Sequence, residues 1–134
     1  MKTKKVVVGV AMLFILAIFS THSLSFSDNM NLSGKLANER GSQPILLQIA
    51  KTGEDYKIHM DMGEPQGWRL AKKQAWDTKG TIDSKGRLTF TGGSNSDHFE
   101  VWQGEDEKFQ IKMESLTPYG KAVVYGELTT VNPR

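Results

Sequence analysis

The stretch that most constrains the fold lies between residues 80 and 113, where the pattern predicts two β-hairpins laid end to end. In the first hairpin, Asp83 and Arg87 flank a three-residue loop that ends in glycine, the residue type suited to a positive φ. This register places Ile82 opposite Leu88, so that an apolar pair follows the ion pair that closes the turn. The turn chemistry and the apolar pattern therefore predict the same hairpin.

The second hairpin has two possible registers. A four-residue loop would pair Trp102 with Phe109, whereas a five-residue loop over residues 104–108 would pair Val101 with Ile111. A slip of one residue turns every side chain to the opposite face of the sheet, so the register decides whether Trp102 is buried. The five-residue loop is favoured, because it places the aliphatic and phenylalanine side chains of both strands on one face.

A third hairpin is predicted around a turn at residues 52–55. Pairing Lys51 with Tyr56 on either side of this turn aligns three apolar cross-strand pairs on one face, namely Ile49 with Ile58, Leu47 with Met60 and Ile45 with Met62. Burial of such a face contributes about 1.5–3 kcal/mol for each large side chain, so we expect this hairpin to belong to the core.

The rest of the chain supplies two further strands and one irregular segment. Alternating residues predict a first strand over 31–37 and a last strand over 121–131, with Gly126 as a bulge or bend. Over residues 63–79 the alternation fails, and we expect a loop with a helical turn that starts at Pro65, with an extended strand as the alternative. Long loops often carry function, so this segment is the first place to look for a site.

Together these segments predict an all-β fold of about eight short strands. Tight loops join most of the strands, and no amphipathic helix is long enough for a crossover between parallel strands. We therefore expect an antiparallel meander that forms a small barrel of lipocalin- or avidin-like architecture, with a β-sandwich as the alternative.

The segment 32–42, with the sequence LSGKLANERGS, resembles the first strand and turn of avidin-type barrels, which bind biotin. Leu36 stands where that family usually has a tryptophan, and the later tryptophan-bearing strands of the family do not match this chain. The resemblance implies a meander barrel, and no biotin-binding residue is carried over. A shared barrel architecture does not by itself imply a shared function.

The first two dozen residues have the pattern of a signal peptide, in which lysines precede an apolar run over residues 6–19. As a helix, this fourteen-residue run would span about 21 Å, less than the ~30 Å of a bilayer core. We expect a signal peptide over 1–25 with cleavage near 23–27, followed by a single barrel-like domain over 28–134. The protein is then exported, to the periplasm or out of the cell, without a permanent membrane anchor.

The charge of the chain depends on this leader, which holds three of the 17 lysines and arginines and none of the 15 acidic residues. The remainder has 14 basic and 15 acidic residues, so the sequence pI near 8.8 does not indicate nucleic-acid binding. The chain has no cysteine, which excludes disulfides, thiol catalysis and cysteine-type zinc sites.

Five residues outside the leader are the candidates for a metal or acid-base site: His59, Asp61, Asp97, His98 and Glu100. Alternation on half-exposed strands explains all of them as surface positions. The sequence also lacks the motifs of nucleophilic elbows, zinc proteases, phosphate loops and dinucleotide sites. We therefore predict neither a metal nor a cofactor, and a function other than catalysis.

The leading hypothesis is a barrel that binds a small apolar or amphipathic molecule, because aromatic residues near a barrel mouth can line a ligand site. Trp68, Trp76 and Tyr56 would contact the ligand, and Arg69 or Lys73 would meet a negative group on it. The competing interpretation of the tryptophans is that they plug one end of the barrel.

The alternative hypothesis is a protein-protein interaction module, such as an inhibitor or an envelope assembly factor. It would use an exposed strand edge or the side chain of Trp102, with His98 and Glu100 beside it on the same strand face. An exposed Trp102 would favour this hypothesis and a buried one would weaken it.

Overall fold

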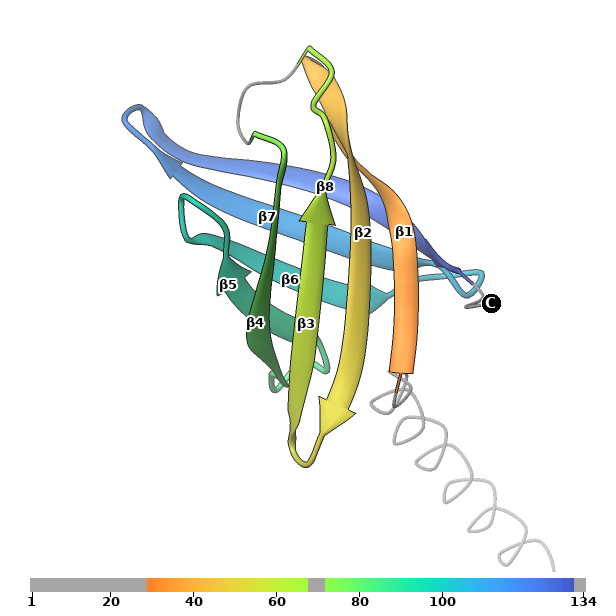
Figure 1. Ribbon diagram of the computed structural model, residues 1–134. Coiled ribbons are helices and arrows are strands. Elements are labelled where there is room, and N and C mark those ends of the chain that lie inside the picture. Colours follow the sequence, from red (N-terminus) through yellow and green to blue (C-terminus); the bar gives the residue numbers. More distant parts are fainter. Residues whose placement is uncertain (1–28, 68–71, 132–134) are drawn as a thin grey trace, which may run out of the picture.

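The computed structural model describes residues 29–67 and 72–131 (Figure 1). Within these ranges the chain forms eight strands, and each strand pairs antiparallel with the next until β8 pairs with β1. The strands are β1 (Asn29–Asn38), β2 (Gly41–Thr52), β3 (Asp55–Met62), β4 (Gln74–Ile82), β5 (Leu88–Gly92), β6 (Asp97–Gln103), β7 (Phe109–Thr117) and β8 (Gly120–Thr130). The result is a closed barrel, so the predicted all-β barrel is confirmed and the sandwich alternative is not what forms.

The barrel is built from two groups of strands that run in different directions. Figure 1 shows β1–β4 side by side in front, with β5–β8 crossing behind them at a steep angle. The two groups join where β4 pairs with β5 and where β8 pairs with β1. No helix in the described ranges is long and apolar enough to cross a membrane.

The three predicted hairpins form in the expected registers. Ile82 pairs with Leu88, and Gly86 in the intervening turn has a φ of 81°, as that position requires. Val101 pairs with Ile111, which is the register of the five-residue loop. The pairs predicted for β2 and β3, from Lys51–Tyr56 to Ile45–Met62, are all present.

The interior of the barrel is filled by apolar side chains that alternate along every strand with outward ones. Phe99 lies at the centre of an aromatic cluster, stacked on Phe90 with ring centroids 5.1 Å apart and tilted against Trp76 at 5.7 Å. The buried apolar residues are Leu32, Leu36, Ile45, Leu47, Ile49, Tyr56, Ile58, Met60, Met62, Leu88, Phe90, Phe99, Val101, Phe109, Ile111, Met113, Val124 and Leu128.

The helical turn predicted between Pro65 and Trp76 is wrong over its last part, because β4 begins at Gln74 and is extended. The pairing of Trp76 with Met60 of β3 explains the difference, since an unpaired edge of β3 offers more backbone hydrogen bonds than one helical turn does. Residues 68–71 lie outside the described ranges.

Gly126 was expected to form a bulge or a bend, and no bulge forms there. The ladders to both neighbours run through it without interruption, with Leu36 on one side and Ile111 on the other. The glycine is required by close approach, because a Cβ placed on Gly126 would overlap the carbonyl oxygen of Lys35.

Candidate ligand-binding face

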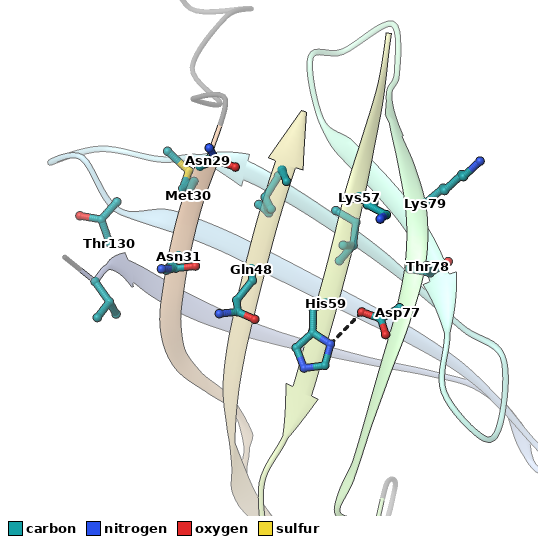
Figure 2. Close-up of a pocket in the computed structure, with 14 residues that line it drawn as sticks. Asn29, Met30, Asn31, Gln48, Lys57, His59, Asp77, Thr78, Lys79 and Thr130 are labelled. Carbon is teal, nitrogen blue, oxygen red and sulfur yellow. Dashed lines mark hydrogen bonds and ion pairs between the residues drawn. The ribbon is translucent and has the colours of Figure 1, made fainter. Parts of the chain in front are cut away.

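The described residues line an open depression of about 850 Å³ on the outer face of β1–β4 (Figure 2). Volumes of this size are typical of sites for small molecules, which usually occupy about 300–1,000 Å³. The depression is lined by Asn29, Met30, Asn31, Gln48, Ile49, Ala50, Lys57, Ile58, His59, Asp77, Thr78, Lys79, Thr130 and Val131.

Strand register arranges most of this lining in three rows that cross the four strands. The two outer rows carry side chains that point away from the core, Asn29–Ala50–Lys57–Lys79 and Asn31–Gln48–His59–Asp77. The row between them turns its side chains inward, Met30–Ile49–Ile58–Thr78. Since residues two apart on a strand lie about 7 Å apart, the outer rows form the walls of a trough across the strands.

The second wall contains a histidine and an aspartate in direct contact. His59 Nδ1 lies 2.9 Å from Asp77 Oδ1, and their side chains are 39% and 85% exposed. Because a carboxylate only accepts hydrogen bonds, the imidazole donates from Nδ1 and keeps Nε2 for another partner. Figure 2 shows Asn31, Gln48, His59 and Asp77 side by side. Beyond Asp77, the row therefore consists of three hydrogen-bonding side chains without negative charge.

The depression differs in character from one end to the other. Lys57 and Lys79 stand on β3 and β4, so positive charge gathers at that end, and Asp77 is the one carboxylate among the lining residues. Val131, just beyond β8, is 42% exposed and gives the other end an apolar surface, beside the partly buried Met30 of β1. Four neighbouring strands span about 14 Å, so the two ends suit the two ends of a short amphipathic molecule.

A second polar group lies inside the barrel, at the end where β6 begins and β7 ends. Asp97 and Ser115 are each only 3% exposed. Burial raises the pKa of the Asp97 carboxyl above its ordinary value of 3.8, and the hydrogen bond with Ser115 opposes this rise. Asp97 Oδ1 has no hydrogen-bond partner among the described residues, nor does the indole nitrogen of Trp76.

Replacing Asp97 with asparagine should stabilise the protein at neutral pH. The pKa of the Asp97 carboxyl is higher in the folded protein than in the unfolded chain. The carboxyl therefore costs no stability at a pH below its unfolded-state pKa. The stability of the protein falls as the pH rises from the unfolded-state pKa to the folded-state pKa. Asparagine carries no charge, so we expect a higher Tm than that of the unchanged protein at pH 7 and a flatter pH profile. Thermal unfolding of D97N between pH 4 and pH 7 measures both effects.

The matched control for this prediction is Asp55→Asn, since Asp55 is exposed at the start of β3. It should leave both the Tm and its pH dependence close to those of the unchanged protein. A D97N variant that lost stability at pH 7, or that kept the original pH profile, would contradict the assignment of an uncompensated buried carboxyl.

The structure separates the residues that were predicted to contact a ligand. Tyr56 and Trp76 both point inward, but Tyr56 pairs with Gly80 and Trp76 pairs with Met60. Four residues of strand between these levels correspond to about 13 Å, so the two rings do not share one site. Lys73 is exposed just before β4, whereas Trp68 and Arg69 lie outside the described residues.

The three residues of the alternative hypothesis do share one face, the outer face of β6. The Arg87 guanidinium lies 4.0 Å from the centroid of the Trp102 ring and covers part of it. Glu100 accepts ion pairs from Arg87 at 3.7 Å and from Lys112 at 3.4 Å. His98, Glu100 and Trp102 are therefore half-buried rather than freely exposed, and charged side chains contact Glu100 and Trp102.

Sequence reasoning missed the pairing of His59 with Asp77. The register predicted for β2 and β3 already placed Gln48 beside His59, so these two residues of the row Asn31–Gln48–His59–Asp77 could be predicted from the sequence. Asp77 fell within the segment assigned to an irregular loop, and only the pairing of β4 with β3 brings it opposite His59.

No group of three or more histidine, aspartate or glutamate side chains in the described ranges is arranged to hold a metal ion. Comparison of the chain with models of known families, with characterised proteins and with solved structures finds no significant match.

Proposed function

We propose that this protein is an exported, non-enzymatic binding protein for a small amphipathic molecule that carries a negative group. The ligand would lie in the depression on the outer face of β1–β4. The observation that carries the proposal is the composition of that depression, in which Lys57 and Lys79 stand at one end and apolar surface at the other.

The outer face is a better candidate than the barrel interior for a physical reason. Eight-stranded barrels are just wide enough to be filled by their own side chains, and here the inward side chains are packed into one cluster. A ligand inside would have to displace side chains such as Phe99, which is fully buried. A ligand on the outer face displaces only water.

Each end of the depression would contribute differently to binding. The lysine ammonium groups would attract a carboxylate, sulfonate or phosphate, and His59 Nε2 and the Gln48 amide would add directional hydrogen bonds. The apolar part of the ligand would cover Val131 and the exposed part of Met30 and remove them from water. This division favours a ligand whose charge and apolar chain lie at opposite ends.

The alternative of a protein-binding module gains less support from the candidate residues. That hypothesis is favoured by an exposed Trp102, and the Arg87 guanidinium covers this ring at 4.0 Å. Glu100 is occupied by ion pairs with Arg87 and Lys112. We therefore place ligand binding first.

Removing the two lysines should weaken binding of an amphipathic anion. We expect decanoate, used as the probe, to bind the protein purified from the exported fraction and to bind K57Q/K79Q about tenfold more weakly, because two exposed charge contacts are worth about 1.4 kcal/mol together. Isothermal titration measures the affinity, and amide shifts in an NMR titration locate the probe, with the largest changes expected at Gln48 and His59.

Lys85→Gln is the matched control, since Lys85 is an exposed lysine in the turn between β4 and β5. It should bind decanoate as the unchanged protein does. Equal affinities for the double variant and the control would overturn the proposal, and so would amide shifts confined to another face of the barrel.

A further inference from the structure

Two cross-strand pairs at the β3–β4 end of the depression bring four ionisable side chains together. Lys57 lies opposite Lys79, and His59 lies opposite Asp77 two residues further along β3. All four line the depression. Opposite residues of an antiparallel pair have Cβ atoms about 5 Å apart, and residues two apart on one strand lie about 7 Å apart. The four side chains therefore form one group, which we call the charge quartet.

The net charge of the quartet changes when His59 gains or loses a proton. The two lysines supply two positive charges and Asp77 supplies one negative charge. The net charge is therefore one positive charge while the imidazole is neutral and two positive charges once it is protonated. Histidine is the residue type whose charge ordinarily changes between about pH 5 and pH 8. Within this range, a lower pH makes the quartet more attractive to an anion.

The contact with Asp77 leaves one ring nitrogen of His59 for a ligand. Asp77 Oδ1 lies 2.9 Å from Nδ1 and accepts its hydrogen bond, and Nε2 has no hydrogen-bond partner among the described residues. A neutral imidazole that donates from Nδ1 can only accept at Nε2, whereas a protonated imidazole donates from both nitrogens. Since an anionic oxygen accepts hydrogen bonds and does not donate them, only the protonated ring can bond to it while keeping the contact with Asp77.

The charged groups that face His59 come from its own strand and from β4. On β3, Lys57 and Asp61 stand two residues to either side of it, and on β4 Asp77 lies opposite, with Lys79 next along that face. Positive and negative neighbours are thus equal in number, so an added anion moves the balance toward the protonated ring. The positions of β2 that face His59 are uncharged: Leu46, Gln48 and Ala50.

We propose that binding of the anion is coupled to protonation of His59, so that the depression holds its ligand more tightly at acidic than at neutral pH. The inference rests on the proposed function, since it concerns the same ligand in the same depression. In the complex the imidazolium donates from Nδ1 to Asp77 and from Nε2 to the anionic group. As the pH rises and the ring loses its proton, this second hydrogen bond and one positive charge are lost, so the affinity falls.

The dependence of affinity on pH tests the coupling. Decanesulfonate is the probe, because its sulfonate stays ionised throughout the range and a change in affinity then comes from the protein. Between pH 5.5 and pH 8 we expect the affinity of the protein purified from the exported fraction to fall about fivefold, the effect of one exposed charge contact. His59→Gln, which keeps a hydrogen-bonding side chain but cannot gain a proton, should show a nearly constant affinity.

Proton uptake gives a second readout that a change in packing would not move. Isothermal titration near pH 7, in two buffers that differ in their enthalpy of ionisation, should give different binding enthalpies for the unchanged protein and equal ones for H59Q. The matched control is His98→Gln, since His98 is the other histidine of the described ranges and lies on the outer face of β6. H98Q should keep both the pH dependence and the proton uptake.

The outcomes separate this inference from the proposed function. A protein that binds decanesulfonate with the same affinity across the pH range, or without proton uptake, would overturn the coupling and leave the binding function standing. The same conclusion would follow if H59Q kept the full pH dependence or if H98Q lost it. Failure of the unchanged protein to bind the probe at any pH would overturn both.

Discussion

Replacing Phe99 with alanine is expected to lower the free energy of unfolding by about 4 kcal/mol. The Phe99 side chain is fully buried. Its ring stacks on Phe90 with an interplanar angle of 10° and meets Trp76 at 41°. Truncation would therefore remove the central ring of an aromatic cluster to which β4, β5 and β6 each contribute. The three strands are held in place by their pairing, so they cannot move together to fill the cavity that remains.

Equilibrium unfolding in urea, followed by tryptophan fluorescence, measures this effect. Tyr119→Ala is the control for loss of an aromatic ring, since Tyr119 is fully exposed, and at high dilution its unfolding free energy should change by less than about 0.5 kcal/mol. If F99A were no less stable than Y119A, the barrel interior could not be packed as described. A smaller cost for Phe99→Leu, about 1.5 kcal/mol, would support a cavity term.

Replacing Gly34 with alanine is expected to cost about 3 kcal/mol, although it adds a single methyl group. A Cβ on Gly34 would overlap the backbone carbonyl oxygen of Glu127 and lie 2.9 Å from the Leu128 side chain. The clash is with backbone, which cannot rotate away, so β1 and β8 would have to separate. Gly126 makes the reciprocal approach to the carbonyl of Lys35.

Loss of the pairing between β1 and β8, which closes the barrel, should be detected by hydrogen exchange as well as by the loss of stability. In G34A, hydrogen exchange should accelerate at the β1–β8 ladder more than at the β2–β3 ladder, and the Tm should fall. Gly104→Ala is the control, because the nearest atom to its added methyl group is in the flexible Gln110 side chain, at 3.2 Å. Similar stability losses in G34A and G104A would show that the close approach of β1 to β8 does not control barrel closure.

Local pattern was sufficient for the hairpins. The loop between Asp83 and Arg87 specifies its own turn, and the backbone N–H of Asp83 donates to the carbonyl of Arg87 at 2.8 Å. The choice between the two registers of Trp102 also needed only the apolar alternation of two neighbouring strands. In each case the contacts that decide the register join residues close in sequence, so the pattern of residues within one hairpin is enough to predict them.

Contacts between distant residues decided the rest. The start of β4 depends on β3, whose edge pairs with Gln74–Gly80 and extends a segment that lacks a strand pattern of its own. The same pairing sets Asp77 beside His59, and so builds one wall of the candidate site. Nothing within residues 63–79 specifies that partner.

The sequence by itself therefore determined the class of fold, the number of strands and three hairpin registers, because turn residues and two-residue alternation act within one hairpin. Only the tertiary structure decided that Gly34 and Gly126 close the barrel and that the interior is filled. It also moved the candidate site from the predicted loop to the outer face of β1–β4. These features depend on contacts between strands that lie far apart in the sequence, such as β1 and β8. Whether such strands come together depends on the twist of the whole sheet rather than on any local pattern.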